Sequence, residues 1–188
     1  MPLIIYALQD NLLDVGYYLL SQLQFIPENY FKNRINITKI AIPSSITSFQ
    51  NFSFYECSSL EYVSFICPSS ITSIGDYAFC LCNSLKEITI PSSLTLIGNY
   101  SFYQCLSLTQ IIIPSSVISI GIGAFSGCLG LVEILFAFPS SVTSFGDNVF
   151  YGCSSLKNIN VPSSVTSIGK YTFYSCSSLT KIIIPSST

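Results

Sequence analysis

The chain of 188 residues contains no histidine and no tryptophan, and only 9% of its residues are charged. An average globular protein carries about 25% charged residues. Seven Lys and Arg against nine Asp and Glu give a net charge of −2, so the chain lacks the basic surface that binds a series of phosphates. We therefore expect no nucleic acid partner, and a surface built mainly of Ser, Thr, Asn and Tyr.

Long apolar runs are missing as well. Hydrophobic residues make up 49% of the chain, but polar residues interrupt every apolar stretch before it reaches the about 18 residues of a membrane-spanning helix. The first residues, MPLIIYALQD, lack the basic region and the cleavage site of a signal peptide, and the last residues form no lipidation motif. No transmembrane segment is expected. The cytoplasm is slightly favoured over the cell surface, and the location itself is left open.

A repeat fills most of the chain. The tripeptide Pro-Ser-Ser recurs with a period of 23 residues and two steps of 25. It starts at Pro43, Pro68, Pro91, Pro114, Pro139, Pro162 and Pro185. Such a period is typical of solenoids, in which each repeat forms one coil that stacks on the next. We predict an N-terminal cap at 1–19, either helical or supplying a first strand, and a solenoid at 20–188. Within the solenoid we expect a degenerate repeat at 20–42, six repeats at 43–184 and the start of another at 185–188.

Each copy has a strand pattern ahead of the proline, Leu-x-x-Ile-x-Ile, as in Leu85, Ile88 and Ile90. Alternation at period two places the Ile residues inward and the residues between them outward. We expect these strands to stack in parallel into one long sheet. Proline should end each strand because it donates no hydrogen bond to a ladder.

Two further sides complete the predicted coil. A second alternation, Val-Thr-Ser-Ile-Gly at 165–169, predicts another short strand, and its recurrent glycine suggests a corner with positive φ. These glycines are Gly75, Gly98, Gly121, Gly146 and Gly169. The third side carries Phe three residues before Cys, as in Phe102 and Cys105, which indicates a single helical turn that packs both side chains inward. The frequent tyrosines beside this side are expected to pack between coils.

The combined motif, Ile-Pro-Ser-Ser-Val-Thr-Ser-Ile-Gly followed by Phe-x-x-Cys-x-Ser-Leu, resembles the BspA-like class of leucine-rich repeats. The resemblance is close over residues 43–188 and loose over 20–42. It implies a right-handed solenoid with a parallel sheet on one face and short helical turns on the opposite side. It also implies surface antigens and adhesins that bind host or matrix proteins.

Six of the eight cysteines recur once per repeat. They are Cys57, Cys82, Cys105, Cys128, Cys153 and Cys176. Because their spacing is that of the repeat, we expect an inward ladder of free thiols and no metal site, and no histidine is available for mixed ligation. Cys67 and Cys80 lie outside the ladder, and whether either pairs in a disulfide stays open. No cofactor is expected.

Catalysis is not expected, because the chain has no histidine and only nine carboxylates. The best pair, Glu87 and Glu133, occupies equivalent outward positions two coils apart, a separation of about 10 Å. That separation is slightly beyond the range of inverting glycosidases. A glycan-processing solenoid is therefore only a remote alternative. A ladder of threonines, such as Thr47 and Thr72, likewise makes glycan binding a remote alternative.

The outward strand positions are the candidate binding site for a protein partner. They vary in size and charge from copy to copy, whereas the inward positions repeat, and exposed strips of this kind hold the partners of solenoid proteins. The candidate residues are Tyr62, Glu87, Gln110, Ile112, Glu133, Leu135, Asn158, Asn160 and Lys181. The predicted function is a non-catalytic protein-binding module. The alternative is a structural or self-assembling intracellular scaffold, because a strand at residues 182–184 would expose a C-terminal edge that can pair with another chain.

Overall fold

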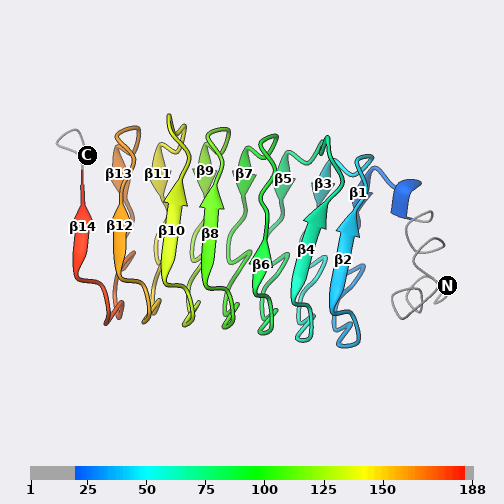
Figure 1. Ribbon diagram of the computed structural model, residues 1–188, viewed down its shortest axis with the longest axis horizontal. Helices are drawn as coiled ribbons and strands as arrows, with labels where there is room; N and C mark the ends of the chain where they lie inside the picture. Colours follow the sequence, from blue (N-terminus) through cyan, green and yellow to red (C-terminus); the bar gives the residue numbers. More distant parts are fainter. Residues whose placement is uncertain (1–19, 185–188) are drawn as a thin grey trace.

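In the computed structural model, which describes residues 20–184, the chain forms a parallel β-solenoid whose coils stack along one axis (Figure 1). Each coil has three sides: a longer strand, a shorter strand and a series of turns. The predicted cap at residues 1–19 and the predicted further repeat at 185–188 lie outside the described residues. The fold is the repeat solenoid that the sequence predicts, with a parallel sheet along one face.

The strands ahead of the prolines form the first side of the coil. Their inward residues, such as Ile40 and Ile111, are buried, and the residues between them are mostly exposed. These strands are β2 (Lys39–Ile42), β4 (Tyr62–Phe65), β6 (Glu87–Ile88), β8 (Gln110–Ile113), β10 (Glu133–Phe136), β12 (Asn158–Asn160) and β14 (Lys181–Ile183). All pairings between them are parallel. Only in the last coil are the inward positions, such as Ile182, exposed.

The first side is not one continuous sheet, so the prediction of one long sheet is wrong. β2, β4 and β6 form a three-stranded sheet, and β8, β10, β12 and β14 form a four-stranded sheet. β6 and β8 lie side by side (Figure 1), but no backbone pairing joins them. The coil ahead of β6 is lengthened by Ile66 and Cys67, and β6 pairs with β4 at only two residues. The Ala137-Phe138 insertion lies ahead of β12 in the same way, yet β12 pairs with both β10 and β14, so an insertion alone does not account for the break.

The second side is continuous. Its strands are β1 (Phe25–Ile26), β3 (Ser48–Phe49), β5 (Ser73–Ile74), β7 (Leu96–Ile97), β9 (Ser119–Ile120), β11 (Ser144–Phe145) and β13 (Ser167–Ile168). They form a seven-stranded parallel sheet in this order. The degenerate N-terminal repeat takes part in both sides, because β1 pairs with β3 and β2 pairs with β4.

The recurrent glycine after each short strand has a different role from the one predicted. Positive φ is found at Gly123, Gly127 and Gly152, which lie on the third side, and not at the corner glycines. A Cβ added at the corner residue Gly98 would lie 2.7 Å from the carbonyl carbon of Gly75. Glycine is therefore required at Gly98 because the coil before approaches too closely for a side chain, whereas the first copy has Gln50 at the equivalent position.

The third side consists of consecutive turns, so the predicted helical turn is wrong in detail. Two residues per coil, four positions apart, have positive φ, for example Tyr100 (51°) and Gln104 (55°). A right-handed helix does not tolerate such residues. They direct alternate N–H groups along the solenoid axis, so that Phe102 N donates to Ala124 O of the next coil at 2.8 Å. The turn side is thereby tied from coil to coil, as the strands are.

Stacked aromatic rings and thiols fill the core. The buried phenylalanines of the third side form a column in which successive ring centroids are 4.8 to 5.8 Å apart. Outside this column, Tyr77 stacks on Tyr100 at 5.2 Å and Tyr151 stacks on Tyr174 at 5.3 Å, which is the packing between coils that the sequence predicts. Offset stacking of this kind adds to the free energy gained by burial.

Candidate functional site

The outward residues of the first-side strands form one exposed surface, here called the strand face. In-register pairing places equivalent residues of successive coils side by side, as in Glu133 opposite both Gln110 and Asn158. All of the predicted partner-binding residues lie on this face. Tyr62 is half-buried, and the other eight are exposed. The structure therefore brings them onto one surface, divided between β6 and β8.

The N-terminal part of the strand face carries two lysines, Lys39 and Lys86, beside Tyr62. Lys39 Nζ and Lys86 Nζ lie 5.1 and 5.8 Å from the centre of the Tyr62 ring. Lys86 also forms an ion pair with Glu61 at 3.0 Å. The hydrogen bond to Glu61 raises the pKa of Lys86. Both lysines are therefore held against β4, away from β8.

The central part of the strand face carries the two glutamates. Gln110 Nε2 donates to Glu133 Oε2 at 2.6 Å, which fixes the side-chain amide of Gln110 across β8 and β10. Glu87 lies on β6, on the other side of the break, and its carboxylate has no hydrogen bond or ion pair to any residue of the described 20–184. Strand β8 thus separates the two carboxylates, and only that of Glu133 accepts a hydrogen bond.

Apolar residues lie next to these charges. Ile112 and Leu135 are neighbours in the ladder between β8 and β10 and are 53% and 38% exposed. Toward the C-terminus, Asn160 lies opposite Ile183, which is 45% exposed. Asn158 and Lys181 continue the polar row. The face is therefore mixed in character, with a small apolar area beside an acidic one.

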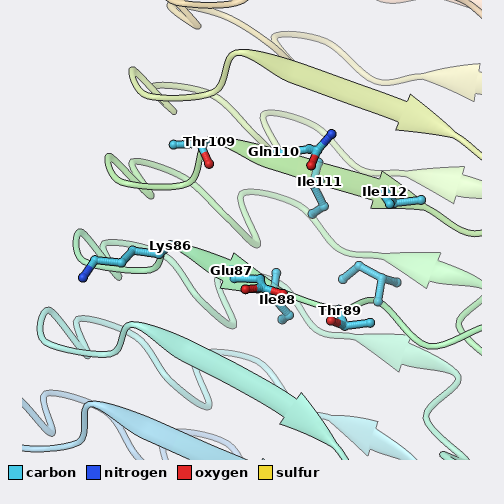
Figure 2. Close-up of a pocket in the computed structure, with 9 residues that line it drawn as sticks. Lys86, Glu87, Ile88, Thr89, Thr109, Gln110, Ile111 and Ile112 are labelled. Atoms are coloured by element: carbon cyan, nitrogen blue, oxygen red, sulfur yellow. The ribbon is translucent and has the colours of Figure 1, made fainter.

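A pocket of ≈ 330 Å³ opens at the break between the two sheets. Figure 2 shows its lining on β6 and β8, with Glu87 and Gln110 on the same side of the sheet. The sequence analysis missed this pocket, because the motif of the copy that contains β6 has the usual spacing. The Ile66-Cys67 insertion in the coil before is no reliable signal, because the matching Ala137-Phe138 insertion is followed by an unbroken ladder.

Residues of the two insertions line two further pockets. One pocket, of ≈ 440 Å³, is lined by Cys67 and Pro68, and the other, of ≈ 340 Å³, is lined by Phe138 and Pro139. Phe138 is 95% exposed.

The thiol ladder is buried and unpaired. Each ladder thiol donates to a main-chain carbonyl of the preceding coil, for example Cys105 Sγ to Phe79 O at 3.2 Å. Burial raises the pKa of Cys57 and of Cys128 to about 12. Cys80 is a buried free thiol and Cys67 an exposed one, so neither forms a disulfide in this structure. The six ladder thiols thus have the structural role predicted for them.

Among residues 20–184, no group of three or more His, Cys, Asp or Glu side chains is arranged to hold a metal ion. In the same residues, no helix has both the length and the apolar character needed to cross a membrane.

Comparison with known families returns one match. The chain matches the family described as BspA type leucine rich repeat region, in six copies, over residues 24–138 and 95–188. No curated protein sequence matches the chain significantly.

Solved structures of bacterial leucine-rich repeat proteins are similar to the chain. A leucine rich cell surface protein from Faecalibacterium prausnitzii is 35% identical, with a TM-score of 0.71 over 77% of this chain. A leucine-rich repeat protein from Bacteroides ovatus is 33% identical, with a TM-score of 0.79 over 88% of this chain. The leucine rich repeat protein of T. pallidum is 31% identical, with a TM-score of 0.75 over 81% of this chain and 69% of its own length. The chain spans only 38% and 42% of the first two proteins.

Proposed function

Because the chain belongs to the family of BspA-type leucine-rich repeat proteins, we propose that it is a non-catalytic protein-binding module whose partner lies against the strand face. The observation that supports this most is the composition of that face. Ile112 and Leu135 form an exposed apolar pair between charged and amide side chains. An apolar centre with a polar rim is the usual composition of a protein interface.

The proposed contact residues are those predicted from the sequence. They are Tyr62, Glu87, Gln110, Ile112, Glu133, Leu135, Asn158, Asn160 and Lys181. Their side chains differ in size and charge between coils that are otherwise alike, so a partner of complementary shape and charge would bind in one register. Catalysis is not part of the proposal, because Glu87 and Glu133 are separated by β8 and no histidine is present.

We place this binding function at the cell surface. The support is the likeness to a protein of F. prausnitzii that is described as a leucine rich cell surface protein. This location differs from the cytoplasmic one that the N-terminal sequence slightly favours. An adhesin or antigen role would follow if the partner proved to be a host or matrix protein.

Site-specific photo-crosslinking tests the proposal. A photoreactive phenylalanine analogue replaces Ile112 on the strand face or Ile118 on the second side; these two isoleucines are 53% and 51% exposed and belong to the same coil. We expect a discrete protein crosslink from position 112 and none from position 118. Equal crosslinking from both positions, or crosslinking from 118 alone, would contradict the assignment of the strand face.

A second candidate is self-association through the edge of β14. Ile182 is 39% exposed, whereas its equivalents Ile159 and Ile134 are buried, and β14 has a neighbouring strand on one side only within residues 20–184. An open strand edge pairs readily with another chain. Sedimentation over a hundredfold range of concentration tests this: a rising mass supports edge pairing, and a constant monomer mass excludes it.

A further inference from the structure

The break between β6 and β8 leaves main-chain groups without partners. In the neighbouring coils the carbonyl that precedes each strand accepts two N–H groups of the next coil. Glu61 O accepts from Lys86 N at 2.9 Å and from Glu87 N at 3.3 Å, and Thr109 O accepts in the same way. Within residues 20–184 the equivalent carbonyl, Lys86 O, accepts no backbone hydrogen bond. Because Lys86 is exposed and lines the pocket, this carbonyl is available to accept a hydrogen bond from a ligand.

Side-chain acceptors stand on both walls of the pocket at this break. Glu87 extends its carboxylate from β6. On β8, the bond from Gln110 Nε2 to Glu133 directs the amide nitrogen toward β10, which leaves the amide oxygen of Gln110 directed toward β6 (Figure 2). The Glu133 carboxylate does not line the pocket, but its hydrogen bond orients the amide oxygen of Gln110 into it. The pocket presents a carboxylate, an amide oxygen and a main-chain carbonyl.

No cation of the described chain neutralises this group of acceptors. Lys86, which also lines the pocket, extends its ammonium toward Glu61 at 3.0 Å and over the Tyr62 ring. Glu87 and Glu133 thus contribute two negative charges, and the lysine beside them is paired elsewhere. The volume of ≈ 330 Å³ is close to the lower limit of ligand pockets, about 300 Å³, so it suits one side chain and not a folded segment.

We propose that this pocket receives one arginine side chain of the protein partner. The planar guanidinium carries five N–H donors and no acceptor, so it complements a site made of acceptors on opposite walls. It would bond to the Glu87 carboxylate and to the Gln110 amide oxygen, with Lys86 O at the inner end. The exposed Ile112 side chain lines the same pocket and packs against the apolar stem of the arginine.

This inference rests on the proposed function, because it names the chemistry of a partner on the strand face. It also explains why the acidic residues lie beside the one interruption of the ladder among the described coils. A continuous ladder would use the carbonyl of Lys86 internally, as it uses Glu61 O, and would leave only a flat surface. The break thus converts a flat sheet into a specific recess.

The test uses a defined probe, Nα-acetyl-arginine methylamide, and amide chemical shifts of the whole 188-residue chain. The matched neutral probe is the citrulline derivative, which has a similar shape and no charge. We expect saturable shifts at Gln110, Ile111 and Ile112 with the arginine probe and none with the citrulline probe. Glu87→Gln should weaken arginine binding about fivefold. Glu28→Gln removes the same charge from an exposed residue outside the strand face and should leave binding unchanged.

Three outcomes would overturn the proposal: equal shifts with the two probes, shifts centred on another coil, or undiminished binding by Glu87→Gln. The crosslinking experiment from position 112 is independent of these. A crosslinked partner together with an unresponsive pocket would reject the arginine site and keep the strand face as the binding surface. Specific arginine binding without any crosslinked partner would support the pocket and reject the proposed protein-binding role.

Discussion

The buried thiol ladder predicts a steep loss of stability at alkaline pH. Burial raises the pKa of Cys128 from 9.0 to about 12, and it raises the pKa of Cys57 to the same value. It also raises the pKa of the other ladder thiols, which are Cys82, Cys105, Cys153 and Cys176. In the unfolded chain these thiols ionise near pH 9. Above that pH the folded state therefore binds more protons than the unfolded state, and stability falls as pH rises.

The magnitude follows from proton linkage. Each thiol that is protonated in the folded state and ionised in the unfolded state lowers the free energy of unfolding by about 1.4 kcal/mol per pH unit. Six thiols, namely Cys80, whose pKa burial also raises to about 12, and the ladder thiols other than Cys176, together give a slope of about 8 kcal/mol per pH unit once all are ionised in the unfolded chain. The free energy of unfolding of an ordinary domain is about 5 to 15 kcal/mol. We therefore expect the fold to be lost within about one to two pH units above pH 9.

Urea unfolding between pH 8 and 10 under reducing conditions measures this slope. Averaged over this range, Cys128→Ala should make the slope shallower by about 0.7 kcal/mol per pH unit, because the unfolded thiol is only half ionised at pH 9; this holds whatever the substitution does to stability at pH 7. Cys67→Ala is the matched control, because Cys67 is exposed and outside the ladder, and its slope should equal that of the parent chain. An identical slope for Cys128→Ala and the parent chain would refute the argument that burial keeps this thiol protonated.

Two further substitutions test the packing between coils. Gly98→Ala places a methyl group 2.7 Å from a backbone atom of the coil before and should lower the free energy of unfolding in urea by about 1 to 3 kcal/mol. Gly152→Ala, at a residue with φ of 71° and no atom nearer than 3.9 Å to the added methyl group, should lower it by only about 1 kcal/mol. Equal costs would contradict the close-approach explanation. Phe102→Ala removes a ring stacked on both sides, at 5.4 and 5.3 Å, and should cost about 3 to 5 kcal/mol, while Phe173→Ala, at the end of the column with one stacked partner, should cost clearly less. A larger cost at Phe173 would show that the column does not stabilise the centre of the array.

Much of this architecture could be predicted, because each coil repeats the same local physics. Alternating Ile residues and the proline after them are enough to place β8, and the spacing of Phe102 and Cys105 is enough to place both in the core. Equivalence between copies then extends each local prediction along the chain. The residues of the strand face could be predicted for the same reason, because in each strand they alternate with the buried inward residues.

The errors came from features that depend on the contact between coils. The role of Gly98 is set by the backbone of Gly75, a residue 23 positions away, and a single copy of the motif contains no sign of that contact. The turns of the third side depend on bonds such as Phe102 N to Ala124 O, which compete with a helix only when the next coil is present. The break between β6 and β8 likewise has no counterpart in the local sequence, because the copy that contains β6 has the usual spacing.

The most direct test of the central claim measures the affinity of the crosslinked partner for a charge-reversed strand face. The variant Glu87→Lys with Glu133→Lys reverses the acidic centre, and Glu28→Lys with Glu56→Lys makes the same change in net charge on the turn side. We expect the first pair to weaken binding at least tenfold and the second pair to leave it unchanged. Unchanged affinity after reversal of Glu87 and Glu133 would contradict the claim that the partner binds the strand face.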